Sequence, residues 1–200
     1  MTGIQALERA CSHKPMKLSR VERIEFEYIR HGTQSLIANW HIAQGQVISP
    51  TIGDSRTEKD FAQHIEATID SAPDAGWIFI VDQLNTHKSE SLVRLVARRC
   101  GIQSPLGVKG ESGILQSMAT RAAFLSDEGH RIRFVYIPKH TSWLNQIECW
   151  FSILVRRLLK RSSFTSTTHL KQKILDFIDY FNRTLAKPFV WKFEGFLEDR

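Results

Sequence analysis

The sequence predicts a mixed α/β fold, in which an antiparallel meander precedes parallel strands and helices flank the sheet. Alternating apolar residues in the first third of the chain are typical of half-buried strands. A short, continuously apolar run later ends at Asp82, and amphipathic helical segments precede and follow that run. Strands that alternate with helices indicate a parallel sheet. The 200 residues are enough for one domain with its own core.

The composition indicates which class of partner the protein binds and in which cellular compartment it lies. The net charge is +6 and the isoelectric point is about 9.4, which favours a polyanionic partner such as nucleic acid. No apolar run reaches the roughly 20 residues that span a bilayer, and the first residues lack the pattern of a signal peptide. Cys11, Cys100 and Cys149 lie far apart without a CxxC pair. This spacing indicates reduced thiols in the cytoplasm and argues against a structural zinc site.

The meander is predicted in the first third of the chain. Residues 3–9 are expected to form a strand, and Ile24, Phe26 and Tyr28 alternate with charged residues as in a half-buried strand. Further strands are expected at 36–42 and 47–48, after turns at 31–33 and at Gly45.

The central strand is predicted at residues 77–81. Thr57 to Asp60 form a capping-box pattern, so a helix should lead up to this strand. Five consecutive apolar residues predict a strand that is buried on both faces at the centre of the sheet. Open parallel sheets bind their ligands at the carboxyl ends of the strands, and Asp82 stands at that end, with Asn85 and His87 in the loop after it. The alternative is that Asp82 merely turns the chain.

A second helix, an insertion and a further strand are predicted after this loop. Ser89 is an N-cap candidate, and Gly101 is a stop signal for the second helix. Residues 102–130 have the composition of an insertion with a short helix at about 115–125. Residues 132–137 then form another strand, which ends at Pro138.

The last motif is a helix expected to begin after Ser142. Its apolar stripe predicts which face is buried: Ile147, Phe151, Leu154 and Leu158. Glu148 lies off this stripe, on the same face as Asn145, Ser152 and Arg156. A carboxylate near a helix N-terminus is also favoured by the helix dipole alone, so Glu148 has a structural explanation as well as a chemical one.

Asp82 and Glu148 together predict a metal site. Both follow strands that are expected to be parallel, and they should therefore meet at one edge of the sheet. Carboxylates from different segments are hard-oxygen ligands suited to Mg²⁺ or Mn²⁺. Such ions promote phosphodiester displacement, which matches a basic protein that holds a polyanion. A small-molecule metallohydrolase is disfavoured because no His-rich ligand set accompanies the acids.

The two motifs IFIVDQLNTHKS and RIRFVYIPKHTSWLNQIECWFSIL resemble the catalytic domain of DDE transposases, in the bacterial insertion-sequence branch of the mariner superfamily. The resemblance implies a single ribonuclease-H-like domain over residues 1–200, Mg²⁺ (or Mn²⁺) as cofactor, and DNA cleavage followed by strand transfer at transposon ends and target. It implies that Asp82 is the second acid of a triad and Glu148 the third. It also implies a bacterial, nucleoid-associated protein without a membrane partner, and it leaves a homodimer open.

The sequence departs from this pattern in two respects. The first acid of the triad is expected just before Met1, and we expect the first catalytic strand and the N-terminal helix-turn-helix region to be absent. The chain should then be an impaired, N-terminally truncated copy, or alternatively a non-catalytic fragment that regulates an intact transposase. Four other acids qualify as the first acid by residue type alone: Glu25, Glu27, Asp54 and Asp60. The insertion at 102–130 also lengthens the spacing between Asp82 and Glu148 beyond that of mariner-type relatives.

Several residues are predicted to support the acids or to contact DNA. Asn85 and His87 are supporting candidates, although a position on a surface loop is the commoner outcome for a histidine such as His87. The residues expected at the DNA are Lys139, His140, Asn145, Arg156, Arg157, Lys160 and Arg161. The four cations at 156–161 also suit a solvated helix end, and Asn145 suits a local backbone partner. Trp143 and Trp150 are candidates for stacking on bases, with a core position favoured for Trp150.

Overall fold

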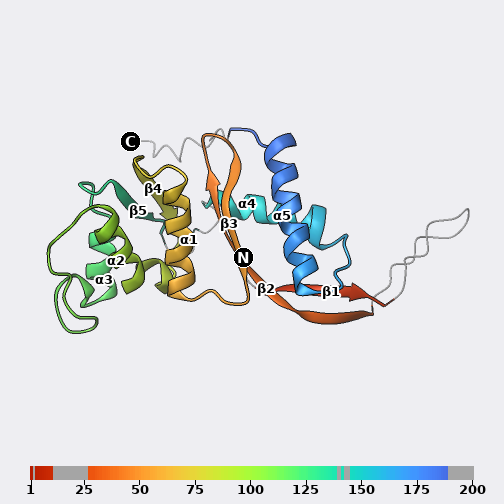
Figure 1. The fold of residues 1–200 in the computed structure, drawn as a ribbon, viewed down its shortest axis with the longest axis horizontal. Coiled ribbons are helices and arrows are strands. Elements are labelled where there is room, and N and C mark those ends of the chain that lie inside the picture. The colour runs from red at the N-terminus through yellow and green to blue at the C-terminus, as the bar shows by residue number, and fades with distance from the viewer. Residues whose placement is uncertain (2, 11–26, 139–140, 142–144, 189–200) are drawn as a thin grey trace, which may run out of the picture.

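The structure, a computed structural model, describes residues 1, 3–10, 27–138, 141 and 145–188. These residues form a mixed α/β fold with two sheets (Figure 1). The strands are β1 (Ile4–Arg9), β2 (Tyr28–His41), β3 (Gln46–Gly53), β4 (Trp77–Val81) and β5 (Ile132–Tyr136). The helices are α1 (Glu58–Asp70), α2 (Glu90–Arg99), α3 (Met118–Leu125), α4 (Gln146–Leu154) and α5 (Thr167–Thr184). Short 3₁₀ turns lie at η1 (Asn85–Lys88) and η2 (Gly113–Leu115), and a π-helical turn, η4 (Val155–Leu159), follows α4.

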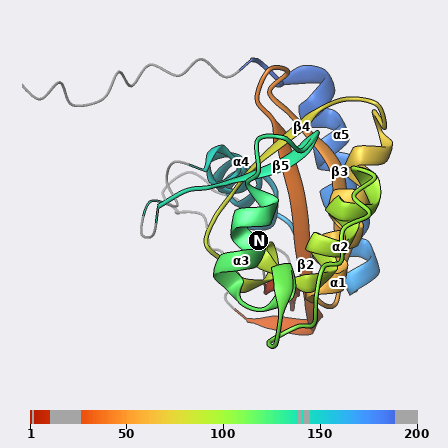
Figure 2. The same ribbon diagram turned by 90° about the vertical axis from the view of Figure 1, so that its left-hand side faces the viewer.

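The antiparallel meander is confirmed, but the predicted turn at 31–33 is wrong. β2 is one strand of 14 residues that pairs with β1 along its first half and with β3 along its second. Figure 2 shows it as a long, unbroken ribbon. The β1–β2 register shifts between Gln5 and Leu7, opposite the segment that contains Gly32, whose φ is +128°. Glycine therefore accommodates a bulge in a continuous ladder and does not reverse the chain.

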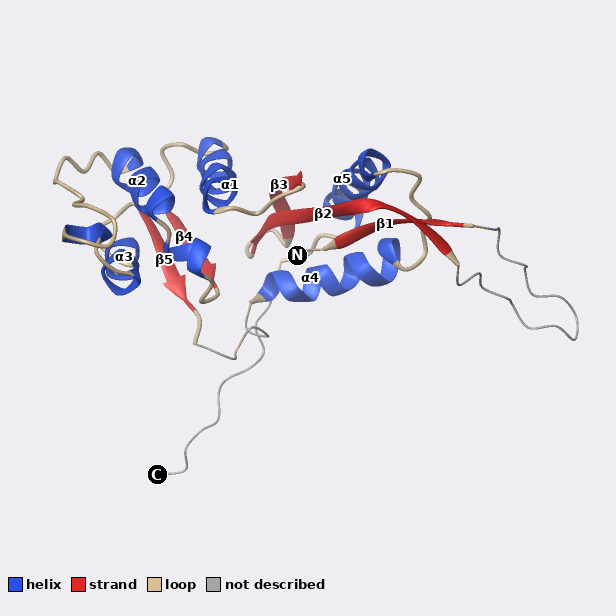
Figure 3. Cartoon of the chain, turned by 90° about the horizontal axis from the view of Figure 1, so that it is seen from below, coloured by secondary structure: helices blue, strands red, loops and turns tan. Residues whose placement is uncertain are grey.

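The parallel pair is confirmed, but the expected burial of its first strand is wrong. β4 pairs in parallel with β5 in a separate two-stranded sheet, as Figure 3 shows. Phe79 and Val81 are each 7% exposed, whereas Ile78 and Ile80 are 57% and 46% exposed. Successive side chains of a strand point to opposite faces, so the face with Phe79 and Val81 packs against the helices and the face with Ile78 and Ile80 is left exposed. Within the described residues β4 pairs with β5 only, so it is not at the centre of a sheet there.

Local capping signals determine the helix starts as predicted. Thr57 and Asp60 form the capping box of α1, and the Ser89 side chain accepts a hydrogen bond from the Leu92 amide at the start of α2. Gly101 follows α2 with a φ of +69°, the left-handed conformation that ends helices. α4 begins at Gln146, later than the predicted start after Ser142, which lies outside the described residues.

The described core consists of two clusters, one on each sheet. α4 and α5 pack against β1, β2 and β3, with Trp150 1% exposed beside the rings of Phe177 and Phe181. α1, α2 and α3 pack with β4 and β5 around Phe79 and Phe134. The Asn39 side chain of β2 donates a hydrogen bond to Thr68 of α1 at 2.7 Å, which links the two halves.

The segment 102–130 packs onto the second cluster, and its predicted short helix is confirmed as α3. Leu115 and Leu125 are both fully buried. The Arg121 side chain, also buried, donates hydrogen bonds to the carbonyl oxygens of Lys88 and Leu115. This segment therefore supports the loop that follows β4. Among the described helices, none is long and apolar enough to cross a bilayer.

Burial of His64 makes stability depend on pH. This α1 side chain is 1% exposed and pairs with the Thr51 hydroxyl at 3.0 Å. Burial lowers the pKa of His64 from 6.5 to about 4. The unfolded chain therefore takes up a proton near pH 6.5 while the folded chain stays neutral, so stability falls as the pH drops from 6.5 towards 4. The loss is up to about 3 kcal/mol.

We expect His64→Gln to make the free energy of unfolding less dependent on pH in this range, because the titrating group is removed. Urea unfolding between pH 7 and pH 4 measures the effect. His41→Gln, which removes an imidazole elsewhere and leaves His64 in place, is the control. An unchanged pH profile in His64→Gln would contradict the assignment.

Candidate metal and DNA site

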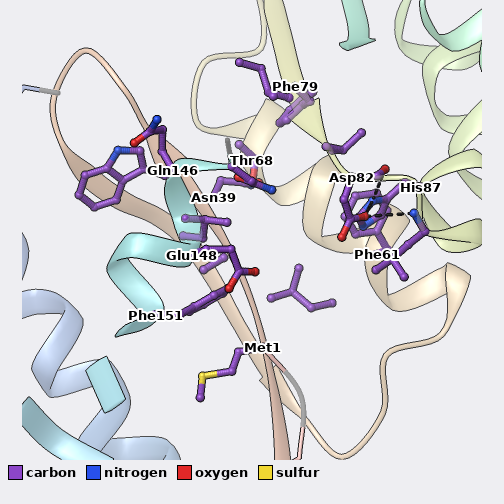
Figure 4. Close-up of a pocket in the computed structure, with 18 of the residues that line it drawn as sticks. Met1, Asn39, Phe61, Thr68, Phe79, Asp82, His87, Gln146, Glu148 and Phe151 are labelled. Atoms are coloured by element: carbon purple, nitrogen blue, oxygen red, sulfur yellow. Dashed lines mark hydrogen bonds and ion pairs between the residues drawn. The ribbon is translucent and has the colours of Figure 1, made fainter. Parts of the chain in front are cut away.

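A cavity of about 910 Å³ lies between the two sheets. Its walls come from β2, β4, η1, the first turn of α4 and Met1. Asp82 and Glu148 both line it, and Figure 4 shows them entering from opposite sides. Asp82 directly follows β4, while Glu148 stands on a helix packed against the other sheet. The acids therefore approach from two parts of the core and not from neighbouring strand ends.

Asp82 is held in its ionised form by His87. The His87 Nδ1 atom lies 2.8 Å from Oδ1 of Asp82, and the Leu84 amide donates to the same oxygen at 3.1 Å. The hydrogen bond from His87 lowers the pKa of Asp82, against a raising effect of burial. Both bonds use Oδ1, so within the described residues Oδ2 has no hydrogen-bond donor. It is the oxygen available to a ligand.

The position of His87 is fixed by its neighbours. Its ring lies 4.3 Å from that of Phe61, measured between centroids, and its carbonyl oxygen accepts a hydrogen bond from the Tyr136 hydroxyl at 2.8 Å. Burial raises the pKa of Tyr136, which keeps this hydroxyl a donor. The Lys88 ammonium lies 4.8 Å from the centroid of the Tyr136 ring. β5 therefore braces the loop that carries His87.

Glu148 is exposed in the first turn of α4, where the buried stripe of the helix turns it away from the core. Ile147 and Phe151 are 9% and 7% exposed. Ser152 and Arg156 continue the Glu148 face: the Ser152 hydroxyl donates to the Glu148 carbonyl oxygen, and Arg156 Nε donates to that of Ser152. Asn145 is the N-cap residue, yet its side chain makes no capping hydrogen bond, and it lines the cavity.

The α-amino group of Met1 lies in the electrostatic field of both acids. It donates to the Leu36 carbonyl oxygen at 2.8 Å, and the Leu36 amide donates to the Met1 carbonyl oxygen at 2.9 Å. Burial lowers the pKa of this amino group, while the charges of Glu148 and Asp82 act in the opposite direction. The two carboxylates therefore favour the charged form of this amino group, and burial and Arg56 oppose it.

The donor atoms on the cavity wall suit a hard divalent cation. Oδ2 of Asp82 and the Glu148 carboxylate are oxygen donors, which Mg²⁺ and Mn²⁺ prefer. Over the described ranges, no cluster of three or more His, Cys, Asp or Glu side chains comes together as a metal site. Among the described residues, the carboxylates that could bind such a cation in this cavity are therefore those of Asp82 and Glu148.

Comparison with known proteins identifies the family. The model of the DDE superfamily endonuclease family matches residues 5–171. The chain belongs to the DDE superfamily endonuclease family. No curated protein and no solved structure matches it.

The remaining predicted residues of this DDE endonuclease domain are distributed as follows. Arg156, Arg157, Lys160 and Arg161 are all exposed, in η4 and the turn after it. Asn85 is exposed in η1 on the cavity rim. Lys139, His140 and Trp143 lie outside the described residues, and Trp150 belongs to the core.

The three alternative first acids that the structure describes, Glu27, Asp54 and Asp60, do not line the cavity of the DDE domain. Asp60 is used in the capping box of α1, and Asp54 accepts a hydrogen bond from Gln34. Glu27 is exposed beside β2, and Glu25 lies outside the described residues.

Sequence reasoning missed Arg56 and Met1, which line the cavity with the two acids. Neither belongs to a motif, so only the folding of β2 against α1 and β4 reveals them.

The contact between His87 and Asp82 can be tested directly. We expect His87→Phe, which keeps a ring beside Phe61 and removes the hydrogen bond, to raise the pKa of Asp82. Carboxyl ¹³C NMR titration measures this change. Asn85→Ala, in the same turn, is the control and should leave the Asp82 titration as it is. A pKa of Asp82 that is the same in His87→Phe as in the wild type would contradict the role of His87.

Proposed function

We propose that this chain is the catalytic part of a ribonuclease-H-like transposase, from the bacterial insertion-sequence branch of the mariner superfamily. Its reaction is metal-dependent cleavage and strand transfer of DNA. The observation that supports this function best is that Asp82 and Glu148, from distant segments of a DDE endonuclease domain, line one cavity. A basic chain suits a DNA substrate.

Asp82 and Glu148 would hold Mg²⁺ or Mn²⁺ in this cavity. The bound ion supplies Lewis-acid activation of a phosphodiester. The chain contributes the rest. His87 keeps the Asp82 carboxylate ionised and oriented through Oδ1. Arg156 and its neighbours, which follow Glu148 along the same helix, would hold the DNA phosphates next to the acids.

Two acids hold such an ion less firmly than three. We therefore expect the 200-residue chain to bind Mn²⁺ and DNA without catalysing transposition by itself. The alternative function is a non-catalytic fragment that modulates an intact transposase, and the exposed cations in η4 suit it because they need no metal to contact phosphates. Those cations can bind DNA whether or not the cavity holds a metal.

We expect Mn²⁺ binding to depend on both acids. Asp82→Asn and Glu148→Gln should each weaken binding by about tenfold or more, since each removes a charged ligand. Electron paramagnetic resonance of free Mn²⁺ during titration measures the affinity. Glu111→Gln removes an exposed acid elsewhere and is the control. Equal affinity in all four proteins would refute the metal site and leave the alternative.

We expect DNA binding to weaken with salt through the cations of η4. Replacing Arg156 and Arg157 together by Gln should reduce the slope of log affinity against log salt by about two units, because each phosphate contact contributes roughly 0.9. Fluorescence anisotropy with a labelled duplex at several KCl concentrations measures the slope.

The matched control removes the same charge from another surface. Lys171 and Lys173 are exposed on α5, and replacing both by Gln should change the slope less. A slope that falls equally in both double variants would mean that the attraction comes from net charge and not from η4. Replacing Lys160 and Arg161 extends the test to the rest of the cluster.

A further inference from the structure

Arg121 of α3 is a buried charge outside the cavity. Its side chain is 9% exposed, and its hydrogen-bond acceptors in the described fold are two backbone carbonyl oxygens. Nε donates to that of Lys88 at 2.7 Å, and Nη1 donates to that of Leu115 at 2.9 Å. An apolar side chain would fill a buried position at a lower desolvation cost. The guanidinium is therefore useful at this position because of the two segments that it joins.

α3 is anchored at both of its ends, and this anchoring fixes the origin of the Arg121 side chain. The helix begins with a capping box between Ser117 and Thr120. The Thr120 hydroxyl also donates to the Ile114 carbonyl oxygen of η2 at 2.9 Å. At the other end of the helix, Leu125 is fully buried in the cluster around β4 and β5. Arg121 therefore extends from a well-anchored helix to the loop that follows β4.

The loop that follows β4 depends on contacts from other segments. It contains η1, a 3₁₀ turn, whose hydrogen-bond geometry is poorer than that of an α-helix. Within this turn the His87 amide donates to the Leu84 carbonyl oxygen at 3.0 Å. Two consecutive carbonyl oxygens are then held by side chains from distant segments, that of His87 by Tyr136 and that of Lys88 by Arg121. These two contacts fix the orientation of the backbone at His87.

The backbone at His87 determines where its ring lies relative to Asp82. Nδ1 of His87 is 2.8 Å from Oδ1 of Asp82, and a hydrogen bond weakens steeply as its length and angle change. A displacement of η1 by about 1 Å would take these two atoms beyond hydrogen-bonding distance. Oδ1 would then lose the donor that holds it, and the direction in which Oδ2 faces a ligand would no longer be fixed.

We infer that Arg121 is a positioning residue of the proposed site: it holds the Lys88 carbonyl oxygen and thereby keeps the His87 ring at the Asp82 carboxylate. The segment 102–130 accordingly supports the loop that carries His87, besides lengthening the spacing between the acids. The consequence for the reaction rests on the proposed function, whereas the contacts themselves need neither metal nor DNA. Groups that orient a metal ligand in this way affect metal affinity without binding the ion.

The test compares Arg121→Ala with Arg131→Ala in the ¹⁵N-labelled 200-residue chain at one fixed pH. Arg131 is the matched control, because its guanidinium also donates to two backbone carbonyl oxygens, those of Ala75 and Arg99, at the other end of the β4–β5 pair. We expect Arg121→Ala to shift the ¹⁵N resonances of the His87 ring towards those of an exposed histidine. Hydrogen exchange of the His87 amide should become about tenfold faster or more, since a charge-assisted hydrogen bond is lost. Arg131→Ala should leave both signals as in the wild type.

Two further measurements separate positioning from a general loosening of the fold. Methylguanidinium, added to Arg121→Ala below denaturing concentration, should restore part of the wild-type His87 signals. Arg121→Lys retains the charge without the fork of donors, and it should speed exchange at His87 by about threefold. The lysine variant also supplies the readout if the alanine variant does not fold. Mn²⁺ binding to Arg121→Ala should weaken by about tenfold.

His87 signals that are the same in both Arg121 variants as in the wild type would overturn the inference. So would an equal change of these signals in Arg131→Ala, because the effect would then not be specific to the contact with Lys88. A wild-type chain that does not bind Mn²⁺ would refute the proposed metal site, and the His87 signals would still decide whether Arg121 positions the ring.

Discussion

The parallel pairing of β4 with β5 is the constraint on which the candidate site depends. The pairing extends over all five residues of β4 and stops at Asp82, so the carboxylate leaves the sheet where the ladder ends. The same pairing brings Tyr136 of β5 to the backbone of His87. His87 in turn reaches back to Asp82 and keeps its pKa low. The parallel ladder of β4 and β5 thus determines where the Asp82 carboxylate lies, and through His87 it keeps that carboxylate ionised.

Glu148 is positioned at the same cavity by helix packing and not by strand pairing. Its position follows from the burial of Ile147, Phe151 and Leu154, which orients α4 against the three-stranded sheet. The acid pair therefore joins two cores that are otherwise distinct. Any ligand held by both acids would also couple the two halves of the chain, because each half contributes one of the oxygens.

The cavity lies at the edges of β2 and β4 that have no neighbouring strand among the described residues. Backbone groups at a strand edge need a partner, and here the edges of β2 and β4 border a space of about 910 Å³. Ile78 and Ile80 are exposed for a different reason, because they lie on the face of β4 opposite the buried Phe79 and Val81.

Local signals in the sequence determined much of the fold. The capping box of Thr57 and Asp60, the Ser89 cap and the Gly101 stop depend on neighbouring residues, and the structure has each of them. The periodic burial of α1, α2 and α4 also follows from the sequence, as does the parallel direction of β4 and β5.

Tertiary contacts decided the rest. Gly32 became a bulge because β1 pairs on both sides of it. β4 became half-exposed because helices pack on one of its two faces, which its own apolar run does not specify. The approach of Asp82, Glu148 and Met1 to one cavity required two separate cores to pack, and long-range packing of this kind leaves no pattern in a single sequence.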